Sequence, residues 1–237
     1  MKTMNRLLLL LALCMPGVTL ADSLAHALAL AAPNAKANVV HLAVAAMQCA
    51  TESGMAAPER LAIIDYSLPS TAKRLWVFDV KQRKLLFREL VAHGRNSGMN
   101  YANQFSNTNG SFQSSLGLFR TTNTYYGKHG YSLRMEGVEQ GINDNAFERA
   151  IVIHGADYVN PGLISKQGRI GRSLGCPAVR RDVAKPLIDH LKDGQYVFAY
   201  YPDREWLTSS AFLTCDSAQQ ARASALASEA GLVARVE

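Results

Sequence analysis

The sequence predicts a mainly β fold with helical segments at both ends. Stretches rich in alanine occupy residues 22–50 and 216–237. Between them, short β-branched and aromatic runs alternate with turns rich in glycine and asparagine, which is typical of strands joined by irregular loops. A chain of 237 residues suffices for one well-cored domain. This order of elements therefore favours one domain built on strands, with helical additions.

The composition excludes a disordered chain, because 48% of the residues are hydrophobic and only 19% are charged. The formal net charge of +6 suits an anionic polymer such as cell wall. Nucleic acid is not an expected partner, since the sequence contains no basic helix and no strand that combines aromatic with basic residues.

Residues 1–21 have the pattern of a secretory signal peptide. Lys2 and Arg6 precede an apolar run at residues 7–15, and Ala21 provides a small residue for cleavage. An uncleaved anchor is the alternative, although the run is short for a bilayer. No later stretch is apolar and long enough to span a membrane. We therefore expect an exported protein, periplasmic or associated with the cell envelope, with no transmembrane segment after cleavage and a formal charge of +4.

Residues 22–57 are expected to form a helical N-terminal segment packed on the core. Pro33 and Asn34 separate two helical pieces. The second piece, residues 35–50, repeats apolar side chains with the helical period. Gly54 and Pro58 close the segment.

Strands are predicted next at residues 61–67, 74–80 and 85–93, followed by a polar loop at 94–113 that is rich in asparagine. Two further strands, 114–121 and 131–137, flank a turn-rich insert at 125–130. The remaining predictions are a helical turn within 141–148, a strand at 150–154, a loop at 156–170, a helix at 182–191, a strand at 195–200 and a helical tail at 213–237.

The richest motif of the chain is residues 168–177, where one cysteine, Cys176, stands among glycines, a serine and two arginines. Glycines allow backbone N–H groups to converge on an anion. Positive side chains favour the thiolate, which is the nucleophilic form of cysteine. The strand at 150–154 ends in His154 and Gly155. A cysteine and a histidine from separate elements are the minimum for nucleophilic catalysis by a thiolate.

Cleavage of the signal peptide would remove Cys14 and leave three cysteines. Cys49 and Cys215 can pair in an oxidising compartment, which would leave Cys176 as a free reactive thiol. The alternative is that Cys49 is a small buried residue on an apolar helix. Both interpretations stay open from the sequence.

Several motifs together resemble the L,D-transpeptidase (YkuD-like) family. His154-Gly155 followed after a loop by Ser173-Leu174-Gly175-Cys176 resembles its catalytic signature, and residues 114–119 occupy the place of its Thr-Pro-x-Gly-x-Phe strand. The branch of murein L,D-transpeptidase catalytic domain family proteins is still more similar. Its features appear at residues 91–98, 105–107, 127–130 and 171–178. The resemblance covers residues 58–212, which are therefore the expected catalytic domain.

The resemblance implies a YkuD-like β-sandwich and attack by Cys176 on an L,D-peptide bond of peptidoglycan stem tetrapeptides. A thioester would form, with His154 as base and acid, and an acceptor amine would yield a 3–3 cross-link. Hydrolysis of the same thioester would instead make an L,D-carboxypeptidase or endopeptidase. A catalytically silent cell-wall-binding module is the remaining alternative. The sequence does not indicate the acceptor or the oligomeric state.

The resemblance also places supporting residues around the pair. Backbone N–H groups of Gly175 and Cys176 are expected to form an oxyanion hole. His93 is expected to orient His154. The other side chains expected to have an orienting or substrate-binding role are His129, Arg169, Arg172 and Ser173.

Arg169 and Arg172 suit a substrate carboxylate, and Ser173 is expected to shape the turn. Solvated loop arginines are the alternative for the first two. Leu174 stands where the family has a histidine, and residues 177–179 depart from the family's run after the cysteine. No cofactor is expected. A metal site of His93, His154 and Cys176 is not favoured, because the spacing lacks a local ligand pattern.

Overall fold

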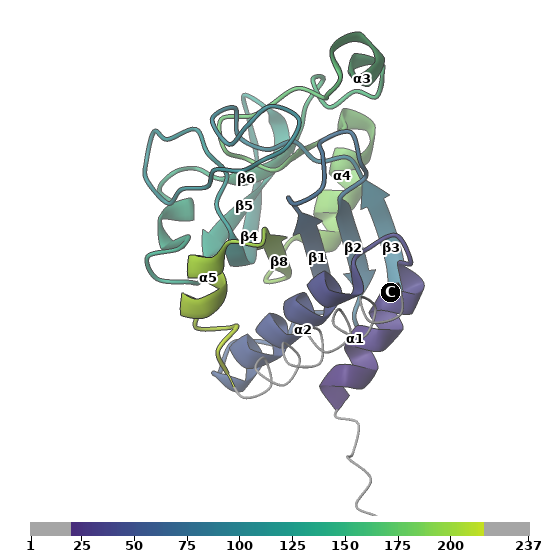
Figure 1. Cartoon of the computed structure of the whole chain (residues 1–237), viewed down its shortest axis with the longest axis vertical. Helices are drawn as coiled ribbons and strands as arrows, with labels where there is room; N and C mark the ends of the chain where they lie inside the picture. The colour runs from purple at the N-terminus through teal and green to yellow at the C-terminus, as the bar shows by residue number, and fades with distance from the viewer. Residues whose placement is uncertain (1–19, 216–237) are drawn as a thin grey trace, which may run out of the picture.

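The computed structural model describes residues 20–215 (Figure 1). Nearly all of the predicted signal peptide, and the predicted tail from residue 216 onward, lie outside the described residues. Both therefore stay predictions. No helix within residues 20–215 combines the length and apolar character that crossing a bilayer would require.

Two helices form where the sequence predicts them, α1 (Leu20–Ala31) and α2 (Ala37–Glu52). They break at the Pro33–Asn34 step. Small side chains let α2 approach the sheet closely, and Val40, Ala43 and Ala46 are fully buried. In Figure 1, α1 and α2 lie side by side, and α2 contacts β1, β4 and β8. The N-terminal segment is thus packed on the core.

The described strands join in one sheet of eight, in the order β3-β2-β1-β8-β4-β5-β6-β7. Their bounds are β1 (Arg60–Asp65), β2 (Leu75–Asp79), β3 (Lys84–Glu89), β4 (Gly117–Gly127), β5 (Gly130–Gly137), β6 (Val152–Gly155), β7 (Ala178–Val179) and β8 (Tyr196–Tyr200). The predicted mainly β fold with helical additions is confirmed.

Most neighbouring strands are antiparallel, whereas β1 pairs with β8 and β6 with β7 in parallel. An isolated bridge between Ala92 and Ala178 links the chain beyond β3 to β7. The two edges of the sheet therefore meet, as in a barrel. Large side chains fill the interior, with Trp76, Phe78 and Phe198 at most 1% exposed.

Helix α4 (Arg181–Leu191) covers β6 and also contacts β1 and β5. Its buried residues Leu187, Ile188 and Leu191 recur at helical spacing. Gly155, at the end of β6, permits this contact, since a Cβ there would stand 3.0 Å from the Cβ of Ala184. The helix thereby holds the strand that carries His154.

The structure corrects two of the predicted elements and adds a helix that was not predicted. The predicted insert at 125–130 is the end of one long hairpin, because Tyr125 and Tyr126 pair with β5 and only Lys128 and His129 turn. The predicted loop at 156–170 contains the short helix α3 (Gly162–Gln167). Helix α5 (Arg204–Ser209) was not expected. Its N-cap, Asp203, accepts a hydrogen bond from the Trp206 backbone N–H at 2.8 Å. The polar stretch 141–148 holds one 3-10 turn, η1 (Asp144–Ala146).

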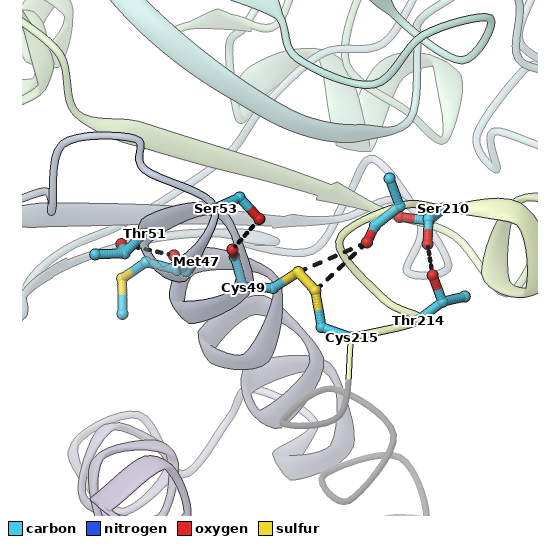
Figure 2. The surroundings of a disulfide bond; sticks show 8 residues. Met47, Cys49, Thr51, Ser53, Ser210, Thr214 and Cys215 are labelled. Atoms are coloured by element: carbon cyan, nitrogen blue, oxygen red, sulfur yellow. Dashed lines mark hydrogen bonds between the residues drawn. A yellow bond between two sulfur atoms is a disulfide. The ribbon is translucent and has the colours of Figure 1, made fainter.

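A disulfide joins Cys49 of α2 to Cys215 (Figure 2), with 6.0 Å between the Cα atoms. Both sulfur atoms lie 3.6 Å from the carbonyl oxygen of Ala211. This settles the alternative that the sequence left open in favour of pairing. Cys176 remains as a free cysteine within the described residues.

Candidate active site

A cavity of about 330 Å³ brings His154 and Cys176 together. Four segments form its walls: residues 109–112, the β4–β5 hairpin, residues 149–158 around β6, and the cysteine turn at 172–176. Lys128, Arg149 and Arg172 line the cavity, whereas no aspartate or glutamate does. The cavity is therefore electropositive.

His154 lies at the end of β6 and is 1% exposed. Its Nδ1 stands 3.0 Å from the carbonyl oxygen of Gly155. Because a carbonyl only accepts, Nδ1 carries the proton and Nε2 is the basic nitrogen. The ring of His129 stacks on that of His154, with 4.3 Å between centroids and 26° between planes.

The pKa of His154 is lowered to about 4, mainly by burial, and the positive side chains of Arg181 and Lys128 act in the same direction. The ring is therefore neutral at neutral pH and can accept a proton. A standing imidazolium–thiolate pair is not favoured. His154 and Cys176 line the same cavity, and no hydrogen bond joins them among the described residues.

Cys176 directs its Sγ toward the carbonyl oxygen of Ala150, at 3.6 Å. Burial raises the pKa of the thiol. The backbone N–H of Val152 and the charges of Arg149 and Lys128 act in the opposite direction, because each stabilises the thiolate.

The turn before Cys176 is held by two serine side chains. Ser173 Oγ donates to the Cys176 carbonyl at 2.6 Å and accepts from the Gly175 N–H at 3.1 Å. Ser114 Oγ donates to the Gly175 carbonyl at 3.0 Å. Gly175 has a φ of +124°, which disfavours any residue with a Cβ. Ser173 thus shapes the turn, in line with its expected part.

This geometry corrects the predicted oxyanion hole. The N–H of Gly175 is occupied by Ser173 and is not free to meet an oxyanion. The backbone N–H of Cys176 makes no hydrogen bond to another described residue. Of the two backbone N–H groups expected to bind the oxyanion, only that of Cys176 is therefore still a candidate donor.

His93 does not orient His154, contrary to expectation. Its Nδ1 accepts from Arg74 Nη2 at 2.7 Å, and its Nε2 donates to the Gly98 carbonyl at 3.3 Å. Burial and the charge of Arg74 lower its pKa to about 4. Its ring therefore fixes the loop after β3, and the Gly155 carbonyl takes the orienting part instead.

The two arginines of the cysteine motif separate. Arg172 lines the cavity and donates to the carbonyls of Arg95 and Gly98 at 2.7 and 2.9 Å. Arg169 donates to the Ile170 carbonyl at 2.9 Å and is not part of the cavity wall. A carboxylate-binding part is thus compatible with Arg172 only. Leu174, 52% exposed, stands at the cavity where the family has a histidine.

Two cationic cavity residues escaped sequence reasoning. Lys128 belongs to the motif at residues 127–130, which is recognisable in the sequence. Its position in the cavity wall depends on the fold. Arg149 follows a polar stretch and precedes a strand. No motif marks it, and only the folded hairpin and loops bring it to Cys176.

The comparisons with known proteins decide the family. The sequence description of the L,D-transpeptidase catalytic domain family matches residues 31–200. The chain belongs to this family. The resemblance to L,D-transpeptidases that the sequence motifs indicated is therefore confirmed. No curated protein matches this L,D-transpeptidase domain by sequence.

Solved structures similar to this L,D-transpeptidase domain share little sequence with it. An L,D-transpeptidase from Mycobacterium smegmatis is 14% identical over 60% of this chain and 59% of its own, with a TM-score of 0.39. L,D-transpeptidase 3 from Mycobacterium tuberculosis, with a faropenem-derived adduct, is 13% identical over 61% of each chain, with a TM-score of 0.37. L,D-transpeptidase (Yku) from Stackebrandtia nassauensis is 14% identical over 78% of this chain and 92% of its own, with a TM-score of 0.37. The chain thus spans about three fifths of the first of these proteins.

Proposed function

We propose that the protein is a cysteine L,D-transpeptidase acting on the stem tetrapeptides of peptidoglycan. The observation that carries this proposal is the shared cavity, which places Cys176 beside a histidine whose basic nitrogen is Nε2. Family membership supplies the class of reaction. The electropositive wall suits a substrate that bears carboxylates.

In the proposed reaction, His154 Nε2 takes the thiol proton as Cys176 Sγ attacks the carbonyl carbon of the L-centre of diaminopimelate. The backbone N–H of Cys176 stabilises the oxyanion, a contribution of about 3 kcal/mol for one such donor. His154 then protonates the departing amine of D-alanine, and a thioester remains. The amine of a second stem attacks this thioester, which forms a 3–3 cross-link and restores the thiol.

Water in place of the acceptor amine would release a tripeptide, which is L,D-carboxypeptidase chemistry on the same residues. The exported location expected from the N-terminal residues is part of the proposal. The Cys49–Cys215 disulfide is compatible with it, since disulfides persist in oxidising compartments.

To test this proposal, purified protein would be incubated with a disaccharide-tetrapeptide muropeptide. The products would be separated by chromatography and their masses measured by mass spectrometry. We expect a cross-linked dimer with the unsubstituted protein and none with C176A or H154A. A tripeptide without dimer would reassign the protein as a carboxypeptidase. Unchanged substrate with folded, unsubstituted protein would contradict both and favour a wall-binding module.

A further inference from the structure

Arg149 lies beside the nucleophile although no motif contains it. It stands between η1 and β6 and lines the same cavity as Cys176. A Cβ placed on Gly175 would be 3.6 Å from Nη2 of Arg149, so the guanidinium reaches the peptide that precedes the cysteine.

Four hydrogen bonds fix the guanidinium. Nη1 donates to the Ser106 carbonyl at 2.6 Å and to Ser115 Oγ, while Nη2 donates to Ser111 Oγ at 3.1 Å and to the Gln113 carbonyl at 2.7 Å. All four acceptors belong to one stretch, residues 106–115. Arg149 therefore anchors that stretch as a wall of the cavity.

Each of these acceptors is neutral. The charge of Arg149 is not compensated, because no aspartate or glutamate among the described residues forms an ion pair with it. The side chain is partly buried, where water screens a charge less than at the surface. Its positive field consequently acts on whatever anion forms in the cavity.

The other groups that face Cys176 stabilise an anion there less strongly at neutral pH. Lys128, on the hairpin, is cationic but exposed to solvent. Tyr66 and Tyr158 are neutral phenols, since burial raises the pKa of each. His154 from β6 is neutral as well. Val152 offers a backbone N–H. Arg149 is thus the partly buried cation of this group.

We propose that Arg149 is a positioning residue for Cys176: its anchored and uncompensated guanidinium supplies the positive charge that favours the thiolate. In this arrangement His154 serves as acid and base without having to be a cation. The inference rests on the proposed function of Cys176 as nucleophile.

The test is the pH dependence of alkylation of Cys176 by iodoacetamide, followed by intact mass with the disulfide left oxidised. In R149M we expect the midpoint to move to higher pH by at least one unit, which lowers the alkylation rate at a fixed pH below the midpoint about tenfold or more. R149K keeps the positive charge but cannot form all four hydrogen bonds of the guanidinium. Its midpoint should stay close to that of the unsubstituted protein. R169M is the matched control, because Arg169 belongs to the same cysteine motif but lies outside the cavity wall and is not among the groups that stabilise the thiolate. Its midpoint should not move.

A midpoint in folded R149M equal to that of the unsubstituted protein would overturn the inference. Thermal unfolding establishes which variants fold. R149Q is a second neutral variant that can retain some hydrogen bonds. If R149M does not fold, the midpoint of R149Q decides in the same way, and an upward shift of a unit or more in R149K would also overturn the role of charge. Alkylation needs no muropeptide, so this outcome is independent of whether the protein forms cross-links.

Discussion

His93 and His154 are both buried and neutral, yet they serve different ends. His93 accepts from Arg74 and donates to a backbone carbonyl, so both of its nitrogens are engaged within the protein. His154 engages only Nδ1 and leaves Nε2 for chemistry. Two histidines that each precede a glycine, one in the loop after β3 and one in β6, thus differ in the partners of their ring nitrogens.

These histidines make the folded protein sensitive to acid. Burial lowers the pKa of each to about 4 in the folded state, against about 6.5 for an unfolded chain. Between these values the unfolded chain binds more protons, so the free energy of unfolding decreases as pH falls from about 6.5 towards 4. The loss is on the order of 3 kcal/mol per histidine once pH lies below both values.

Urea unfolding at pH 7, 5.5 and 4.5 measures this dependence. H93Q, which can accept from Arg74 and donate to Gly98 without titrating, should reduce the loss of stability. H26Q, on the exposed face of α1, is the control and should leave it intact. Equal pH slopes for H93Q and the unsubstituted protein would contradict the assignment.

At this scale, motifs predicted that Cys176 and His154 belong to one site, and the two do share a cavity, but motifs did not predict which residues surround them. Cys176 and His154 are marked by their neighbours in sequence. The partners that set their properties are not, since Arg74 reaches His93 across 19 positions and Arg149 lies 27 positions before Cys176. Such contacts depend on how the chain packs, which local patterns do not encode.

Among the elements, the β4–β5 hairpin has the most direct bearing on the site. It carries His129 onto the ring of His154 at its turn, where Gly130 adopts a φ of +77°. An aromatic pair of this kind contributes about 0.5–1.5 kcal/mol. The hairpin thereby restrains the orientation of His154.

Replacing His129 should therefore affect catalysis more than stability. In H129A we expect the rate of product formation from the muropeptide to fall by up to about tenfold, because His154 loses its stacked neighbour. H129F retains a stacking ring and should keep most of the rate. Initial rates and melting temperatures of both variants provide the measurement. An H129A rate equal to that of the unsubstituted protein would contradict the role of the hairpin in orienting His154.

The elements with strong local patterns were predictable. Alternating or continuous apolar runs located seven of the eight described strands, and helical spacing located α2 and α4. The missed elements are short ones: β7 has two residues, and α3 and α5 have six each. These elements depend on a neighbouring strand or a cap, and they are too short for an apolar repeat to be recognised in the sequence. The full length of β4 was missed because its tyrosines sit beside a glycine-rich turn.

At the scale of the whole molecule, the Cys49–Cys215 disulfide joins α2 to the last described residue, across a sequence separation of 166. Closing so long a loop restricts the unfolded chain strongly. We expect the double variant C49S/C215S to lose about 2–4 kcal/mol of unfolding free energy, measured by urea unfolding without reductant. C176S keeps the bridge and serves as control. A midpoint unchanged by the double substitution would show that the bridge adds no stability.

At the centre of the sheet, Leu61 of β1 faces Tyr196 of β8, which follows it by about 135 residues. A ribosome that adds about 5–20 residues per second needs roughly 7 to 27 s to cover that distance. β1 lacks the neighbour that β8 provides throughout this interval and β4 lacks it from its own synthesis onward, and Cys176 is made 20 residues before Tyr196. Cys176 is thus synthesised before the sheet beside it can close, and the last of the described strands completes the middle of the sheet.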